Sequence, residues 1–210
     1  MRGSFLCVEG VIGVGKTTLM KKLAAHFKTE RLFEIITENP YLEKFYDDMD
    51  AWSFQTEMFF LCNRVKQLED TSTLLDQGQT VIADYYIGKN LIFAHQTLHE
   101  EKYNQYKRIY DILIEPLPKP EAIIYLKADF NTIMDRIKVR GRSFEQNMDH
   151  TYIKNLMNDY EQAMSAIKDF IPVITIDTSH LDFVTDQDDF EAIVEQITTN
   201  FGTRKENDHA

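Results

Sequence analysis

One short stretch near the N-terminus, residues 10–18, constrains the fold of this chain more than any other. Its sequence, GVIGVGKTT, fits the pattern G-x-x-x-x-G-K-[ST]. The residues at the fixed positions are Gly10, Gly15, Lys16 and Thr17. An apolar run over residues 5–8 precedes the stretch, and residues 19–27 follow it with apolar side chains at helical spacing. A glycine-rich turn between a strand and a helix is the setting that identifies a phosphate-binding loop.

This loop predicts that the chain binds a nucleoside triphosphate. The N–H groups of a glycine-rich turn and the positive end of the following helix attract phosphate oxygens. Lys16 can reach the β- and γ-phosphates, and the Thr17 hydroxyl can ligate Mg²⁺. The expected contacts of ATP in the loop are Gly10, Gly13, Val14, Gly15, Lys16, Thr17 and Thr18. Phosphate binding alone does not reveal which reaction follows it.

Five short apolar runs alternate with helical stretches along the chain. The runs are residues 5–8, 32–37, 80–83, 122–126 and 173–176. This alternation predicts an α/β fold in which a five-stranded parallel sheet carries helices on both faces. A long helix is expected over residues 52–69, a weakly helical segment over 41–50 and a polar, frayed tail over 202–210. With 210 residues and neither a linker nor a repeat, the chain should form one domain, 1–210.

The composition restricts the partners and the cellular location. A net charge of -11 argues against nucleic acid as a partner, because a polyanion would be repelled. No apolar run reaches the length of a membrane span, and the N-terminus lacks the basic and apolar regions of a signal peptide. The two cysteines, Cys7 and Cys62, lie in apolar surroundings and are expected to stay reduced. We therefore expect a cytoplasmic protein that acts on small molecules, without a nucleic-acid or membrane partner.

A cluster of cations near residue 140 can supply the positive charge that ATP requires in so acidic a chain. Its members are Arg136, Lys138, Arg140 and Arg142. Phosphoryl transfer spreads negative charge over the transferring group, and nearby cations stabilise that charge. We expect residues 136–150 to form an Arg-rich lid over ATP, with Gly141 as a hinge. The alternative is a solvated helix end whose cations interact with the helix dipole.

Two carboxylates follow predicted strands, at the edge of the sheet where ligands of such folds collect. Glu38, at the end of the second strand, is the candidate general base that would accept the proton of an attacking hydroxyl. Glu34 is the competing carboxylate, but it would lie within that strand. Asp84, at the end of the third strand, is expected to hold Mg²⁺ together with Thr17. Capping of a helix N-terminus is the alternative for both Glu38 and Asp84.

The long helix carries Glu57 and Arg64, which lie seven residues apart and therefore share one face. Ionisable side chains in a mostly apolar helix are costly unless they meet a partner, so the two could simply pair with each other. As a binding site, Glu57 would accept from N1–H and the 2-amino group of guanine, while Arg64 or Lys89 would donate to O6. Adenine would fit less well, because its N1 lone pair would face the carboxylate. The aromatic residues that could stack on a base are Phe54, Phe59, Phe60 and Phe93, although most should belong to the core.

Several further segments resemble the deoxyribonucleoside kinases, and among these the bacterial deoxyguanosine (deoxypurine) kinase branch. Besides the phosphate loop, these segments are ENPYLEKFY (38–46), WSF (52–54), RGR (140–142) and PVITID (172–177). The resemblance extends over residues 4–201. It implies a P-loop kinase fold, and transfer of the γ-phosphate of ATP to the 5′-hydroxyl of a deoxynucleoside. It also implies a homodimer, or a heterodimer with a related kinase.

The same resemblance implies roles for individual residues. The residues that match the family's catalytic and phosphate-binding positions are Lys16, Glu38, Arg136, Arg140 and Arg142. Tyr46 and Glu145 match the pair that holds the 3′-hydroxyl, and the loop after Asp177 would lie near the adenine of ATP. The position that commonly holds a base-reading Gln carries Glu57, with Gln55 two residues earlier, so either of them could face the base.

One stretch departs from the family pattern. After the third strand the family carries an acidic residue, an Arg and a Ser, whereas this chain reads Ala83-Asp84-Tyr85-Tyr86 and lacks the arginine. Asp often occurs further on in the family, where this chain has Lys89, a change that suits a donor to guanine O6.

The leading interpretation is a kinase of deoxyguanosine, and deoxyadenosine is the alternative acceptor. A nucleoside monophosphate kinase, similar to thymidylate kinase, would need cations for the acceptor's phosphate, and Lys44 is the only one close to Glu38 and Tyr46. A regulatory nucleotide-binding module is a third class. The chain lacks the Asn-Lys-x-Asp motif of GTPases, and a dedicated lid favours catalysis.

Overall fold

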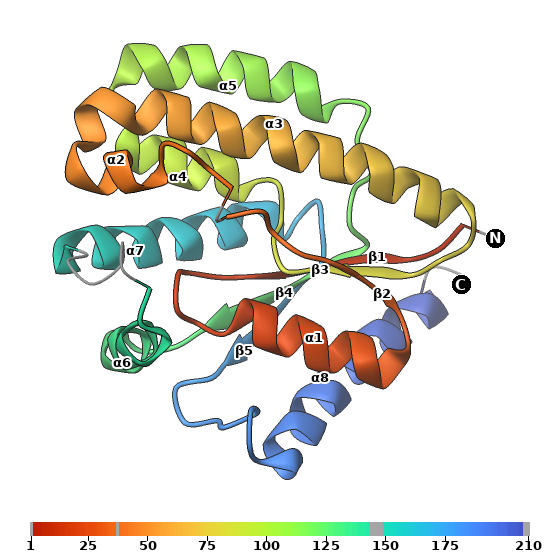
Figure 1. Ribbon diagram of the computed structural model, residues 1–210. Coiled ribbons are helices and arrows are strands. Elements are labelled where there is room, and N and C mark those ends of the chain that lie inside the picture. Colours follow the sequence, from red (N-terminus) through yellow and green to blue (C-terminus); the bar gives the residue numbers. More distant parts are fainter. Residues whose placement is uncertain (1, 37, 143–148, 208–210) are drawn as a thin grey trace.

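The computed structural model describes residues 2–36, 38–142 and 149–207. Its centre is a parallel sheet of five strands in the order β2-β3-β1-β4-β5 (Figure 1). The strands are β1 (Phe5–Glu9), β2 (Glu30–Leu32), β3 (Val81–Ala83), β4 (Ala122–Lys127) and β5 (Val173–Asp177). The helices are α1 (Lys16–Phe27), α2 (Leu42–Asp47), α3 (Met49–Asp76), α4 (Lys89–Thr97), α5 (Glu100–Ile114), α6 (Phe130–Arg140), α7 (His150–Ile167) and α8 (Gln187–Asn207). The predicted α/β fold with a five-stranded parallel sheet is confirmed.

The central strand β1 brings the phosphate loop to the middle of one edge of the sheet. In the register of the sheet, Cys7 lies opposite Ala83 of β3 and Ile123 of β4, and all three are buried. Because all the strands are parallel, their carboxyl ends share one edge. The segments that follow β1, β2, β3 and β5 therefore meet there.

Helices cover both faces of the sheet (Figure 1). Helices α1 and α8 lie on one face, while α3, α4, α5 and α7 lie on the other. Apolar residues of α1 and α8, such as Leu23 and Ile193, are buried in one core cluster with strands β1 and β4. A second cluster joins α3, α4 and α5 to β3. None of the helices in the described parts of the chain combines the length and the apolar character that a membrane span needs.

The second strand is shorter than the sequence predicts. It runs from Glu30 to Leu32 rather than over residues 32–37, so only Leu32 belongs to both, and it ends where β3, with which it pairs, ends at Ala83. Past that point the backbone N–H of Glu34 donates to Asp84 Oδ1 (2.7 Å) instead of continuing a ladder. Glu34 therefore lies just beyond the edge of the sheet and not within a strand.

Other boundaries also differ from the prediction. Helix α3 starts three residues earlier than predicted, because the Asp48 side chain caps it by accepting from the N–H of Ala51 (3.1 Å). Helix α8 continues to Asn207, through most of the tail that was predicted to be frayed. Cys62 is exposed, whereas Cys7 is buried as expected, and both are free thiols.

Gly10 can be occupied only by glycine, because of its backbone geometry and its surroundings. Its φ is 149°, and a Cβ there would lie 2.3 Å from the carbonyl oxygen of Leu126 in β4. Gly141, which ends α6, also has a positive φ of 66°, but a Cβ there would meet nothing closer than 3.9 Å. Both glycines have a positive φ, but only at Gly10 would a side chain also overlap a neighbouring strand. Comparing the two positions therefore distinguishes the cost of overlap from the cost of backbone strain.

Gly10→Ala should lower the free energy of unfolding by about 2–5 kcal/mol, because strain and overlap with β4 add together. Gly141→Ala should cost only about 1 kcal/mol, because the new methyl group has room. Urea unfolding of both variants measures the difference. Equal losses of stability in the two variants would show that overlap between a Cβ at position 10 and Leu126 adds no cost.

Candidate functional site

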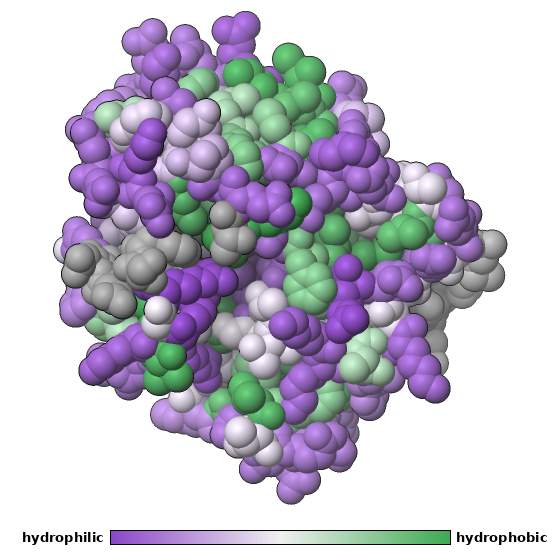
Figure 2. Space-filling view, viewed as in Figure 1, coloured by the Kyte–Doolittle hydropathy of each residue, from purple (hydrophilic) through white to green (hydrophobic). Residues whose placement is uncertain are grey.

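A cavity of about 640 Å³ opens at the edge where the strands end. Its walls come from the phosphate loop, the segment after β2, helices α1, α2, α3, α4, α6 and α7, and the loop after β5. Figure 2 shows this face hollowed near its centre, beside strongly hydrophilic side chains. Small-molecule sites commonly have volumes of about 300–1,000 Å³. The cavity is therefore large enough for a ligand of nucleotide size.

The phosphate loop forms one end of this cavity. Lys16 Nζ donates to the carbonyl oxygens of Gly10 (2.7 Å) and Val11 (3.1 Å). Burial, and next the charge of Lys89, lower the pKa of Lys16 to about 8. Gly13, Gly15, Thr17 and Thr18 also line the cavity, whereas Gly10 and Val14 are not among its lining residues.

Oxygen atoms of two side chains lie together beside the loop. Thr17 Oγ1 donates to Asp84 Oδ2 (2.6 Å), as expected if both follow the carboxyl ends of adjacent strands. Mg²⁺ prefers such oxygen ligands and usually takes the rest of its shell from phosphates and water. The side chains present therefore fit a magnesium ion brought in with a triphosphate.

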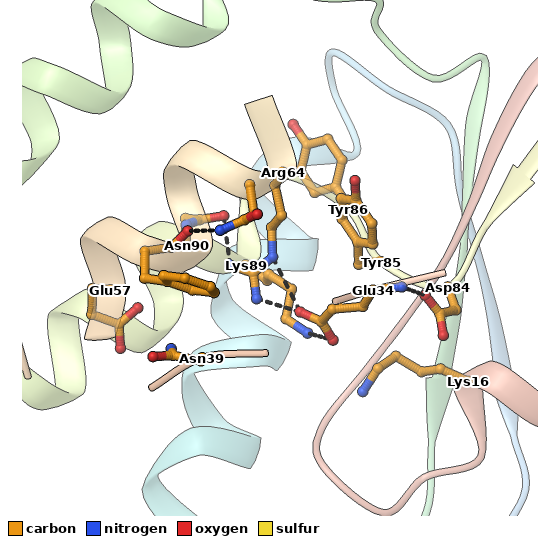
Figure 3. A network of polar contacts seen from close by, with 12 residues as sticks. Lys16, Glu34, Asn39, Glu57, Arg64, Asp84, Tyr85, Tyr86, Lys89 and Asn90 are labelled. Atoms are coloured by element: carbon orange, nitrogen blue, oxygen red, sulfur yellow. Dashed lines mark hydrogen bonds and ion pairs between the residues drawn. The ribbon is translucent and has the colours of Figure 1, made fainter. Parts of the chain in front are cut away.

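Glu34 is the centre of the polar network in the cavity (Figure 3). Its Oε1 accepts from Arg64 Nε (3.1 Å) and is in close contact with Nη2, while its Oε2 accepts from Lys89 Nζ (3.0 Å). Burial alone would raise the pKa of Glu34, but Lys89, Arg64 and Lys16 outweigh it and hold the pKa well below its usual range. Glu34 is therefore an ionised carboxylate, although its side chain is only 7% exposed.

Glu38, the predicted base, does not reach the cavity. Its side chain is exposed and is not among the residues that line the walls. Asn39, next to it, is buried, and its amide donates to the carbonyl oxygen of Thr56 (3.4 Å). This contact fixes the segment with Glu38 turned outward. Glu34 takes the position that the sequence assigned to Glu38.

Glu57 lies at the opposite end of the network from Lys16 (Figure 3). It is 3% exposed, lines the cavity and accepts a long hydrogen bond from Thr97 Oγ1 (3.3 Å). Burial raises the pKa of Glu57 to about 7, against the opposing charges of Arg64 and Lys89. Gln55 is exposed and lies outside the cavity, because two residues along a helix face opposite directions. Of these two candidates, the structure places Glu57 in the site.

Arg64 does not pair with Glu57 in the described structure. Besides contacting Glu34, it donates from Nη1 to Asn90 Oδ1 (2.8 Å). Asn90 in turn donates to the hydroxyl of Tyr106 (2.7 Å). Asn90 and Tyr106 were not predicted from the sequence as site residues. Asn90 was detectable as a polar residue next to Lys89 at the start of a helix, but Tyr106 reads as an ordinary core residue.

The structure changes several other expectations for this end of the cavity. Lys89 lines the cavity and is bound to Glu34, so its role as a donor to O6 stays a prediction. Tyr46 and Phe93 line the cavity as predicted. Phe54 lies outside it, packed in the second core cluster with Lys102 Nζ 5.1 Å from its ring centroid, and Phe60 lines the wall instead.

Arg136 holds two loops together. Its Nη1 donates to the carbonyl oxygen of Val14 (3.0 Å) and to Thr178 Oγ1 (2.9 Å), and its Nη2 donates to the carbonyl oxygen of Thr178 (2.8 Å). These contacts tie the phosphate loop to the loop after β5. Arg136 also lines the cavity, so its direct role in phosphate binding and catalysis stays a prediction.

The rest of the predicted lid lies partly outside the described residues. Arg140 and Arg142 line the cavity, on either side of Gly141, where α6 ends. Glu145 lies outside the described residues. Asp177 does not line the cavity, because its side chain accepts from Ser179 N–H (2.9 Å) and Ser179 Oγ (2.6 Å), but Leu181–Val184 of the following loop do.

This chain is similar to known proteins over nearly its whole length. The deoxynucleoside kinase family model matches residues 6–201. Deoxyguanosine kinase of Bacillus subtilis (strain 168) is 48% identical over 197 residues, which cover 92% of this chain and 95% of that protein. Deoxyadenosine/deoxycytidine kinase of the same organism is 32% identical over 206 residues, which cover 94% of this chain and 93% of that protein.

A solved structure has the same fold. Deoxyadenosine kinase from M. mycoides with bound dCTP matches with a TM-score of 0.81 and 25% sequence identity, covering 93% of this chain and 99% of that chain. The family model and both relatives extend over nearly the whole sequence, phosphate loop and cavity walls included. The chain belongs to the deoxynucleoside kinase family.

Proposed function

We propose that this kinase transfers the γ-phosphate of ATP to the 5′-hydroxyl of a purine deoxynucleoside, with deoxyguanosine as the preferred acceptor. The observation that carries the proposal is the position of Glu34. Its carboxylate lies between the phosphate loop, marked by Lys16, and the end of the cavity that holds Glu57 (Figure 3). A nucleoside whose base faces Glu57 would present its 5′-hydroxyl to Glu34.

In this proposal Glu34 orients the hydroxyl and accepts its proton. The 5′-oxygen forms a bond to the γ-phosphorus while the bond from that phosphorus to the β,γ-bridging oxygen breaks, and ADP leaves. Because the transition state of such transfers is loose, the hydroxyl loses its proton late, and a weakly basic carboxylate suffices. Lys16 stabilises the charge that develops on the phosphate oxygens, and Lys89 and Arg64 hold the carboxylate in place.

Thr17 and Asp84 would hold the magnesium ion of MgATP. When it is bound, Mg²⁺ neutralises negative charge on the β- and γ-phosphates. Arg140 and Arg142 line the cavity on the α6 side and would bind the same phosphates. The loop containing Leu181–Val184 would contact the adenine of ATP.

Glu57 supports the preference for guanine. A buried carboxylate matches the two adjacent donors of the guanine edge, N1–H and the 2-amino group. Arg64 uses Nε, Nη1 and Nη2 for one described contact each, so two of its five N–H groups remain to donate to O6. The relative with 48% identity is a deoxyguanosine kinase, whereas the one with 32% identity is a deoxyadenosine/deoxycytidine kinase.

Other acceptors and assemblies that were expected from the sequence have different degrees of support. Deoxyadenosine stays a candidate acceptor, since relatives of both specificities match this chain. A monophosphate acceptor has less support, because its phosphate would add negative charge beside Glu34, whose carboxylate already shares the charges of Arg64 and Lys89. Assembly as a homodimer, or with a related kinase, stays a prediction.

Glu34→Gln should lower turnover by about 10²–10⁴-fold, because an amide cannot accept the proton of the 5′-hydroxyl. Binding of ATP, measured by calorimetry, should change little. Glu38→Gln is the matched control and should keep the turnover of the native enzyme, because Glu38 is exposed and lies outside the cavity. If Glu38→Gln lost most of its turnover while Glu34→Gln stayed active, Glu38 and not Glu34 would be the base.

A panel of acceptors with ATP tests the substrate. At about pH 8, kcat/KM for deoxyguanosine should exceed that for deoxyadenosine by roughly a hundredfold or more, because a site built for hydrogen bonds rejects a base that leaves them unmade. Deoxyinosine lacks only the 2-amino group of guanine and should fall between the two. Deoxyguanosine monophosphate should not be phosphorylated. Equal rates with deoxyadenosine and deoxyguanosine at this pH would contradict the proposed reading of the base.

A further inference from the structure

Glu57 is a buried carboxylate without a salt bridge in the described parts of the chain. The titratable and charged groups that face it are Arg64 on α3, Lys89 on α4, Tyr106 on α5, Tyr152 on α7 and Glu34 beyond β2. Both cations in this set are bound to Glu34 instead. The one described hydrogen bond to the Glu57 carboxylate comes from Thr97 Oγ1, at 3.3 Å. Glu57 therefore lacks the partners that normally keep a buried carboxylate ionised.

The groups around Glu57 permit both of its charge states near neutral pH. Burial raises the pKa of Glu57 to about 7, while Arg64 and Lys89 act in the opposite direction. Burial also raises the pKa of Tyr106 and of Tyr152 well above their usual range, so both tyrosines stay neutral. Glu34 stays ionised, because its pKa is held well below its usual range. Glu57 is thus the group that changes charge in this part of the cavity.

The two charge states recognise different base edges. A carboxylate can only accept, so it fits N1–H and the 2-amino group of guanine and opposes the N1 lone pair of adenine. A neutral carboxylic acid both donates and accepts, as a carboxamide does. Its O–H can donate to adenine N1 while its carbonyl oxygen accepts from the 6-amino group.

We propose that the proton on Glu57 decides which purine deoxynucleoside this enzyme accepts. The carboxylate admits deoxyguanosine and the neutral acid admits deoxyadenosine, so deoxyadenosine phosphorylation is a second activity that appears as the pH falls. This inference rests on the proposed function, because it requires the base to lie against Glu57.

The proposal has a consequence for proton balance. Deoxyguanosine binds the carboxylate, so its binding near pH 7 releases a proton from the fraction of molecules that carry one. Deoxyadenosine binds the neutral acid, so its binding takes up a proton in the ionised fraction. The two substrates should therefore differ in the sign of proton exchange.

The kinetic test measures kcat/KM for both substrates between about pH 6 and pH 8.5. The ratio of kcat/KM for deoxyadenosine to kcat/KM for deoxyguanosine should fall about tenfold per pH unit throughout this range, because the ratio of neutral to ionised Glu57 falls by that factor. Titration of Lys16 and of ATP affects both substrates alike and cancels in the ratio. In Glu57→Gln the ratio should be independent of pH and shifted toward deoxyadenosine. Glu69→Gln, an exposed change on the same helix, should reproduce the native profile.

The binding test counts protons by calorimetry in buffers of different ionisation enthalpy, without ATP. We expect binding of deoxyguanosine to release protons and binding of deoxyadenosine to take them up. In Glu57→Gln, binding of either substrate should exchange no protons. A ratio that does not change with pH in the native enzyme, with both purines phosphorylated, would overturn this inference and leave the proposed function standing. Failure to phosphorylate any purine deoxynucleoside at any pH would overturn both.

Discussion

The ion pairs that Glu34 makes with Arg64 and Lys89 are the interaction on which the rest of the site depends. They join the segment after β2 to α3 and α4, and the backbone N–H of Glu34 adds Asp84 and thus β3. Breaking a buried pair by removing one partner typically costs about 3–5 kcal/mol, because a buried charge is left alone. The segment after β2 and the two helices are therefore fixed in relation to one another by charge as well as by packing.

This arrangement gives the cavity two ends with different chemistry. At one end, Lys16 and the glycine-rich turn supply donors and positive charge for a triphosphate. At the other, Glu57 would offer acceptors to a base, because the neighbouring cations Arg64 and Lys89 form their ion pairs with Glu34. Arg64 contacts Glu34 and lies beside Glu57, so the group that would help to read the base also positions the proposed catalytic carboxylate.

Much of this could be predicted from the sequence, because the phosphate loop and the apolar runs are local patterns with a fixed structural meaning. The phosphate loop and the parallel sheet follow from these patterns. Asp84 lies beside Thr17 because the carboxyl ends of parallel strands share one edge of the sheet. The position of Glu38 could not be predicted, because an edge strand is only as long as its pairing with the neighbouring strand, and β2 pairs with β3 only over Glu30–Leu32. The contacts of Arg136 with Val14 and of Asn90 with Arg64 join residues far apart in the sequence, and no local pattern reveals them.

A crystal structure with deoxyguanosine and an ATP analogue that cannot transfer its γ-phosphate tests the central claim most directly. The quantity to measure is the distance from the nucleoside 5′-oxygen to the carboxylate oxygens of Glu34. A hydrogen-bond distance of about 2.6–3.2 Å, with the guanine edge against Glu57, is what the account predicts. A 5′-oxygen beyond the reach of Glu34, or a base that faces away from Glu57, would contradict it.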